Sequence, residues 1–266
     1  MTASTEPLPP GFFAPDPGPA AWYKMLLAQT GIELKLTLRH GEQLLLNLVI
    51  PVLLTVALVT QPFISLDTDS TGLTKVEFLV PGVLALAVMS ASFTGLAIAT
   101  GFERRYGVLK RLGATPLPRW GLLGGKTLAV ACLEVLQIAV ISGVGLTLGW
   151  RPHGDPASVL LLVVLGTAAF AGLGLLMAGT LRAEATLAGA NLVWFLLLFL
   201  GGIVFPLSSF PTGVQDVLQY LPSAALADGL RVVLGNGEAP PIHDLLTLLV
   251  WAAGALTAAA ATFRWD

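Results

Sequence analysis

The sequence predicts an all-α membrane protein with six transmembrane helices, an N-terminal amphipathic helix at the membrane interface, and both termini in the cytoplasm. Apolar residues make up 55% of the 266 residues, and charged residues make up only 11%. The surface of a soluble domain needs about 25–35% charged residues, so this composition argues against a soluble globule. The net charge of −2 gives no basic field for nucleic acid. A single cysteine excludes an internal disulfide framework.

Six long stretches of the chain contain almost no charged residue. A membrane-spanning helix needs about 20 apolar residues, because the hydrocarbon core is about 30 Å thick and a helix rises about 1.5 Å per residue. The only acidic residue well inside a stretch is Glu134, in the third one. The expected spans cover residues 43–65, 78–101, 121–149, 157–181, 187–205 and 241–263.

The segments outside the spans differ in character. Residues 1–20 contain six of the 18 prolines and neither Lys nor Arg, which predicts a disordered cytoplasmic tail. Residues 21–41 mix apolar and basic residues at near-helical spacing, which suits an amphipathic helix lying in the interface; an extension of the first span is the alternative. Residues 42–266 are expected to form the transmembrane domain, with a cytoplasmic loop at 102–120 and an outer segment at 206–240.

The basic residues set the expected orientation. Of the 14 Lys and Arg residues, only Lys75, Arg151 and Arg231 fall on one side of the six spans, and the other 11 fall on the opposite side. Cytoplasmic loops of membrane proteins carry the excess of Lys and Arg. Both termini are therefore expected on the cytoplasmic side.

The densest basic feature is the loop at residues 101–126, which holds six of the 14 basic residues. Val108, Leu109 and Leu112 give this loop a short apolar stripe, and two prolines after it end any helix. An ordinary positive-inside loop would explain the basic residues, but not the stripe or the proline break. A short amphipathic helix that docks into a soluble partner explains both.

At these residues the sequence resembles the permeases of ABC-2 type transporters. Their pattern is approximately E-R-E-x-G-T-L-K-R-L, then A/V-T-P-L-S-R, then G-K. This chain has ERRYGVLKRL at 103–112, ATPLPR at 114–119 and GK at 125–126. The resemblance covers nearly the whole chain apart from the Pro-rich tail, and it looks most like short bacterial drug and antibiotic efflux permeases.

The resemblance implies an ABC-2, type V exporter-like fold in the cytoplasmic membrane of a bacterium. Two such permease subunits, identical or related, would pair, and two copies of a cytoplasmic ABC ATPase subunit would attach to them. The ATPase would bind ATP and Mg, so no cofactor, catalytic residue or metal ligand is expected on this chain. The expected coupling helix comprises the ATPase-coupling residues Glu103, Arg104, Arg105, Gly107, Val108, Leu109, Lys110, Arg111 and Leu112.

Two further groups of residues follow from the resemblance. Spans one, two and five would line the pathway and the subunit seam, and short helices after the fifth span would cap the pathway at the outer leaflet. The pathway candidates are Asn47, Ser90, Thr94, Asn191 and Phe195. The outer cap candidates are Phe205, Pro206, Pro211, Pro222, Asp228 and Arg231.

The chain itself is not expected to hydrolyse ATP. Its GGKT at 124–127 is similar to the end of a phosphate-binding P-loop, but Trp120 stands where G-x-x-x-x-G-K-[ST] needs its first glycine, and no strand precedes it.

The intramembrane polar residues Glu134 and Gln137 leave two interpretations open. Glu134 could serve as a proton or cation site, or it could be bonded to a polar residue of a neighbouring helix.

These observations predict the permease subunit of an ATP-driven exporter in the lipid bilayer. Its mostly apolar spans, with scattered Asn, Ser, Thr and Gln, fit an amphipathic small molecule such as a drug, an antibiotic or a lipid-like compound. The alternative is an ion-coupled secondary transporter that uses Glu134. Such transporters often contain inverted repeats, and residues 43–150 and 157–263 show no convincing repeat.

Overall fold

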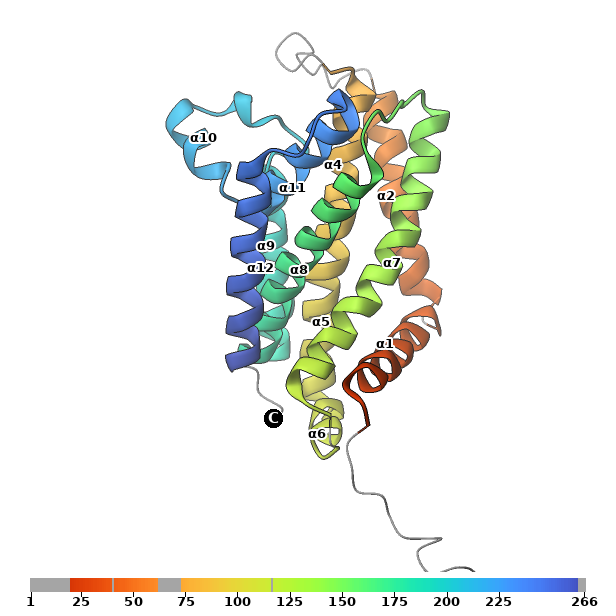
Figure 1. The fold of residues 1–266 in the computed structure, drawn as a ribbon, viewed down its shortest axis with the longest axis vertical. Helices are drawn as coiled ribbons and strands as arrows, with labels where there is room; N and C mark the ends of the chain where they lie inside the picture. The colour runs from red at the N-terminus through yellow and green to blue at the C-terminus, as the bar shows by residue number, and fades with distance from the viewer. Residues whose placement is uncertain (1–19, 40, 62–72, 116, 263–266) are drawn as a thin grey trace, which may run out of the picture.

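The computed structural model describes residues 20–39, 41–61, 73–115 and 117–262, and within these ranges the chain forms helices and no strand. The long helices run side by side along the longest axis of the molecule (Figure 1). The first helix, α1 (Trp22–Arg39), instead crosses obliquely near one end of the bundle. The expected disordered tail lies outside the described residues except for its last residue.

Five helices in the described ranges are long and apolar enough to cross a membrane. A sixth long-axis helix, α2 (Gly41–Thr60), runs beside them and has a shorter apolar part, Asn47–Thr60. For the described residues, the prediction of an all-helical architecture with several apolar helices is thus confirmed. The five helices are the continuous Lys75–Arg105 helix, α7 (Arg119–Thr147), α8 (Pro156–Thr180), α9 (Ala183–Leu200) and α12 (Ile242–Thr262).

The continuous helix at Lys75–Arg105 forms the centre of the bundle. Its first part, α4 (Lys75–Met89), is buried from Phe78 to Met89, and it packs against α2, α7, α8 and α11. A capping box starts the helix, in which Thr74 and Glu77 bond to each other's backbone amides. All-round burial of an apolar helix is the pattern expected when other helices enclose it.

A π-helical turn, η1 (Ser90–Gly95), interrupts this helix before it continues as α5 (Leu96–Arg105). The π turn lies against α8, where a Cβ on Gly174 would come within 2.7 Å of the Phe93 carbonyl oxygen. Helix α9 is fixed to it by Trp194, whose indole Nε1 donates to Ser90 Oγ over 2.9 Å. π turns are rare and frequently occur at functional sites.

Short helices close the end of the bundle opposite α1. They are η2 (Leu207–Ser209), α10 (Thr212–Leu218), α11 (Pro222–Arg231) and η3 (Val232–Asn236). α10 projects at the periphery, whereas α11 lies within the bundle end and packs on α4, α8 and α12 (Figure 1). Residues 222–227 of α11 are all buried, so this helix is a packed part of the core and not a surface lid.

Candidate functional site

The basic segment after the central helix forms two helices and not one. Glu103, Arg104 and Arg105 complete α5, and a new helix, α6 (Val108–Gly113), begins after Gly107. Gly107 has φ +72°, a left-handed conformation that glycine adopts without strain. The expectation of one coupling helix from Glu103 to Leu112 is therefore wrong, because this glycine turns the chain. α6 lies at the very end of the bundle (Figure 1).

The apolar and basic sides of α6 face in different directions. Leu109 is completely buried and Leu112 partly buried, in an apolar cluster that includes Leu96 and Leu122. Lys110 and Arg111 are exposed. α6 is thus anchored through its leucines: of the apolar stripe expected to dock into a soluble partner, only Val108 is exposed, and Leu109 and Leu112 pack inside the bundle instead.

Arg104 and Arg105 hold α5 against the turn between α8 and α9. Arg104 donates to the carbonyl oxygen of Ala178 over 2.9 Å and also to that of Leu181. Arg105 forms an ion pair with Glu184 in the first turn of α9. Cations at the C-terminal end of α8 complement its helix dipole, so these two arginines stabilise the packing of three helices.

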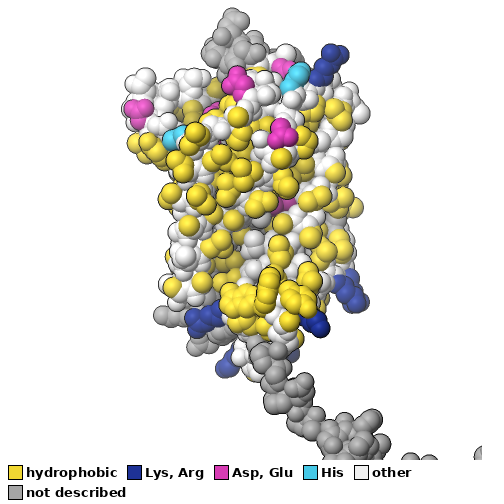
Figure 2. Space-filling model, in the orientation of Figure 1, with side chains coloured by type: hydrophobic (Ala, Val, Ile, Leu, Met, Phe, Trp, Pro, Cys, Tyr) yellow, Lys and Arg dark blue, Asp and Glu magenta, His cyan; other side chains and the backbone are white. Residues whose placement is uncertain are grey.

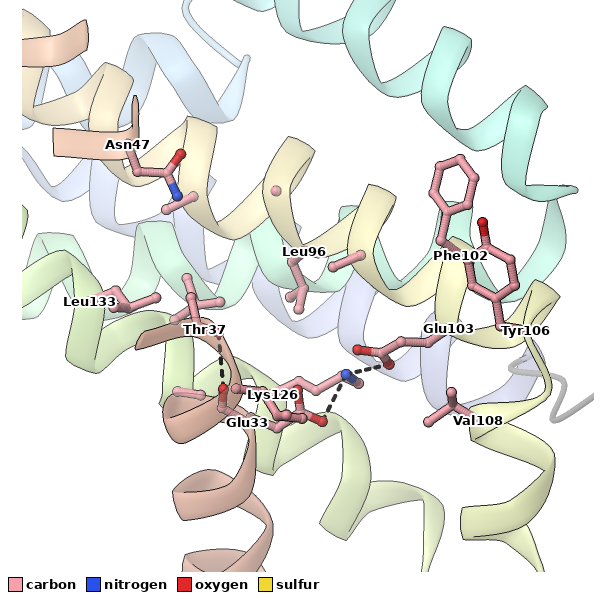
Figure 3. Close-up of a pocket in the computed structure, with 16 residues that line it drawn as sticks. Glu33, Thr37, Asn47, Leu96, Phe102, Glu103, Tyr106, Val108, Lys126 and Leu133 are labelled. Atoms are coloured by element: carbon pink, nitrogen blue, oxygen red, sulfur yellow. Dashed lines mark hydrogen bonds and ion pairs between the residues drawn. The ribbon is translucent and has the colours of Figure 1, made fainter. Parts of the chain in front are cut away.

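Glu103 belongs to a buried charge cluster that joins α1, α5 and α7. The Lys126 ammonium lies 2.6 Å from Glu103 Oε2 and 2.8 Å from Glu33 Oε1 (Figure 3). Only 2% of the Lys126 side chain is exposed, against 14% for Glu33 and 27% for Glu103. A buried ammonium must be paired and hydrogen-bonded, and the two carboxylates supply this.

Close packing of α1 on α7 brings Glu33 to Lys126. A Cβ on Gly125 would lie 2.5 Å from Gln29 Cγ, so only glycine permits this approach. Gln29 Nε2 then donates to Glu33 Oε1 over 2.7 Å. The Gly-Gly-Lys sequence lies inside α7, so it forms a helix contact and not a phosphate-binding loop.

A cavity of about 370 Å³ adjoins the charge cluster. Glu33, Glu103 and Lys126 lie at one part of its wall, and Tyr106 and Val108, on either side of the Gly107 turn, border it (Figure 3). A smaller neighbouring cavity shares four of its lining residues and reaches Gln137. The residues common to both are Thr37, Asn47, Ala91 and Leu133.

The expected pathway residues lie in two separate places. Ser90 and Thr94 are on η1, and Asn191 and Phe195 are exposed on α9. The structure brings η1 and α9 into contact at the Trp194–Ser90 hydrogen bond. Asn47, on α2, instead lines the cavity beside α1 and α7.

The two intramembrane polar residues of α7 contact different helices. Glu134 is 1% exposed, and Thr167 on α8 donates a hydrogen bond to its Oε2. Gln137 is 5% exposed, and its Nε2 donates to the Asn47 carbonyl oxygen over 2.9 Å. Glu134 therefore has the neighbouring-helix bond expected of a structural residue. Among the described residues, no cluster of His, Cys, Asp or Glu is suited to hold a metal ion.

At the opposite end of the bundle, Arg231 is the buried centre of the expected outer cap. Its Nε donates to the Phe78 carbonyl oxygen over 3.1 Å, and its guanidinium lies 3.7 Å from the centre of the Phe78 ring. A second nitrogen donates to the Ile203 carbonyl oxygen over 2.8 Å. Burial lowers the pKa of Arg231 to about 10, so it stays charged at neutral pH.

The other expected cap residues organise the chain around Arg231. Pro206 and Pro211 precede η2 and α10, and Pro222 is the first residue of α11, a position where proline's fixed φ suits a helix start. Asp228 and Phe205 are exposed. The cap candidates thus belong to one region, but only Pro222 and Arg231 enter the core.

Three residues of this arrangement were not among the sequence-based candidates. They are Glu33, Lys126 and Trp194. A cation seven residues after the first residue of an apolar helix is itself a signal, because it requires a partner. That signal could have selected Lys126, but the sequence does not specify which carboxylates pair with it.

Comparison with known proteins agrees with this architecture. The model of the family described as "ABC-2 family transporter protein" matches residues 22–262. The probable doxorubicin resistance ABC transporter permease protein DrrC of Mycobacterium tuberculosis is 29% identical over 182 residues, which cover 65% of this chain and 64% of DrrC. The putative transport permease YvfS of Bacillus subtilis is 29% identical over 174 residues, 62% of this chain and 68% of YvfS.

A further relative is matched over a smaller part of its length. The linearmycin resistance permease protein LnrN of Bacillus subtilis is 28% identical over 163 residues, which cover 59% of this chain and 41% of LnrN. The family model spans all of the described helices. The chain therefore belongs to the ABC-2 transporter family, as a membrane permease with several apolar helices.

Proposed function

We propose that this chain is the permease subunit of an ATP-driven exporter that moves an amphipathic small molecule out of the cytoplasm. The observation that carries the proposal is α6, whose Lys110 and Arg111 are exposed at the end of the bundle while Leu109 is buried. Such a helix can bind a separate ATPase and pass its movement to α5. Relatives named for doxorubicin and linearmycin resistance support export of an amphipathic compound.

The proposal includes a defined assembly. ATP and Mg bind to a cytoplasmic ABC ATPase, present in two copies, and a second permease subunit completes the pathway. With α2 counted beside the five helices that are long and apolar enough to span, the chain crosses the membrane six times and has both termini in the cytoplasm. Most Lys and Arg of the visible face gather at the α6 end, and most Asp and Glu at the other (Figure 2), which supports this orientation.

The test is to reverse the two cations of α6. The variant Lys110→Glu/Arg111→Glu is co-expressed with the cognate ATPase, reconstituted, and assayed for substrate-stimulated ATP turnover. We expect at least about a tenfold loss of stimulation, because like or mismatched charges at an interface cost several kcal/mol, together with normal membrane insertion. Lys24→Glu, an exposed cation on α1, is the matched control. Equal stimulation in the wild type and the double variant would contradict the proposal, as would ATP turnover by the purified permease alone.

Glu134 supports a second candidate, an ion-coupled transporter. Its carboxylate is buried in α7, and Oε1 has no hydrogen-bond partner among the described residues. If Glu134 carries the coupling ion, substrate transport collapses with the proton gradient, ignores ATP, and stops in Glu134→Gln. If the chain is an ATP-driven permease, transport follows ATP and persists in that variant.

A further inference from the structure

The cavity beside the charge cluster has a clear electrostatic character. Only three of the sixteen residues that line it are charged, namely Glu33, Glu103 and Lys126. Two carboxylates share one ammonium, so the lining carries an excess of one negative charge. Because Lys126 is almost fully buried and Glu103 is more exposed, the carboxylates are more accessible from the cavity than the ammonium.

The remaining walls are suited to an apolar body. Leu36, Leu96, Val130 and Leu133 contribute aliphatic side chains, and three alanines also line the cavity. The rings of Phe102 and Tyr106, also in the wall, are stacked with centroids 6.1 Å apart. Aromatic faces attract organic cations, and these two rings lie on the same side of the cavity as Glu103 (Figure 3).

The far end of the space is polar. Gln137 lines the smaller neighbouring cavity, is 5% exposed, and has no hydrogen-bond partner for its amide oxygen among the described residues. A buried unsatisfied acceptor is costly, and a ligand that donates a hydrogen bond would satisfy it. The space therefore has an acidic end, apolar walls and an acceptor beyond them.

We propose that this cavity binds an amphipathic organic cation, with the positive group beside the Glu103 carboxylate and the apolar body against the leucine side chains. The inference rests on the proposed function and names the class of its substrate. An anionic lipid or a phosphate compound is disfavoured, since it would meet the excess negative charge of the lining. Because Tyr106 and Val108 border both the cavity and α6, an occupied cavity also contacts the segment that is proposed to bind the ATPase.

The experiment compares two probes of matched size and opposite charge. The full permease, co-purified with its ATPase, is placed in nanodiscs of electroneutral lipid without nucleotide. Equilibrium binding of radiolabelled tetraphenylphosphonium and, in separate samples, of radiolabelled tetraphenylborate is measured. We expect saturable binding of the cation, no saturable binding of the anion, and at least about tenfold weaker cation binding in Glu103→Gln, since one lost charge contact in a partly buried site costs more than about 1.4 kcal/mol.

Two further variants separate binding from folding. Leu133→Trp fills the cavity without changing its charge, and we expect it to abolish binding. Glu184→Gln removes an exposed carboxylate that does not line the cavity, and we expect affinity within about twofold of the wild type. The double variant Glu33→Gln/Glu103→Gln leaves Lys126 as the only charge, so its preference should shift toward tetraphenylborate.

The outcomes distinguish this inference from the proposed function. The cation site is overturned if Glu103→Gln and Glu184→Gln bind the cation with equal affinity. It is also overturned if Leu133→Trp binds as the wild type does. Either result holds against the site even if ATP-driven transport is intact. Cation binding that depends on Glu103 without any ATP-driven transport upholds the site and contradicts the exporter. Saturable binding of tetraphenylborate with the same affinity as the cation also overturns the proposal.

Discussion

Gly125 is the residue at which α1 comes very close to α7, and the buried charge cluster depends on it. The absence of a side chain there lets Gln29 lie against the α7 backbone, and Gln29 in turn holds Glu33 toward Lys126. Gly82 has a comparable role at the other end, where a Cβ would lie 2.6 Å from the Ile203 carbonyl oxygen that Arg231 binds. Both charged centres of the protein are therefore built on glycines.

Substitution of Gly125 tests this dependence. Gly125→Ala should lower stability by about 1–3 kcal/mol, because the new methyl group overpacks the α1–α7 contact. Gly143→Ala, in the same helix but with nothing within 4 Å of the added Cβ, should be neutral or stabilise by up to about 1 kcal/mol. Thermal unfolding of the purified variants in detergent measures the difference. Equal melting temperatures would show that α1 is not held by this contact.

The bonding partners of single side chains could not be predicted from the sequence. Trp194 reads as one more apolar residue of a span, yet its indole N–H is bonded to Ser90 on η1. Glu33 reads as a surface charge on an amphipathic helix, yet it pairs with a lysine that lies 93 positions later in the chain. Such partners depend on how helices are arranged in space, and a single sequence contains that information only indirectly.

Among the elements, α6 depends on the direction of the chain at Gly107. A left-handed residue between two helices redirects the backbone, so that Leu109 points into the bundle while Lys110 points away. With a right-handed residue there, α5 would continue straight, and the leucine would lose its place among Leu96 and Leu122.

Two substitutions at Gly107 separate the effect of its backbone conformation from the effect of side-chain crowding. Nothing lies within 4 Å of a Cβ at this position, so only the positive φ matters. Gly107→Ala should cost about 1–2 kcal/mol and lower substrate-stimulated ATP turnover with the partner ATPase. Gly107→Asn should retain more of both, because Asn tolerates the left-handed conformation. If Ala and Asn variants behave alike, the turn is not what positions α6.

The sequence predicted that the long segments form helices, but it did not predict where a helix breaks or changes type. Long apolar stretches have few alternatives to membrane helices, so the all-helical nature of the chain and its family followed from composition and motif. The break at Gly107 and the π turn at Ser90–Gly95 did not follow. Ser, Thr and Gly occur in membrane helices wherever backbones pack closely, so their presence alone does not mark a change of helix type.

At the scale of the whole molecule, the two ends differ in charge and in construction. The α6 end carries most of the visible Lys and Arg, the middle is apolar, and the opposite end carries most of the visible Asp and Glu (Figure 2). The acidic end contains the packed helix α11 with a cavity of about 270 Å³ beside Arg231, whereas the basic end contains the cavity of about 370 Å³ and its charge cluster. An exporter needs its uptake site where substrate is offered, so the proposed function requires the α6 end to face the cytoplasm.

Cysteine accessibility decides the orientation and whether the number of spans is even or odd. The single native cysteine is removed as Cys132→Ser, and single cysteines are then placed at exposed positions in Tyr23→Cys, Thr262→Cys and Asp216→Cys. In intact cells, a membrane-impermeant maleimide should label only the Asp216 variant, because α10 is at the acidic end. The other two should react only after permeabilisation, since six spans return the chain to its starting side. If Thr262→Cys but not Tyr23→Cys is labelled in intact cells, the number of spans is odd. If both are labelled, α6 lies outside the cell, where no cytoplasmic ATPase could reach it.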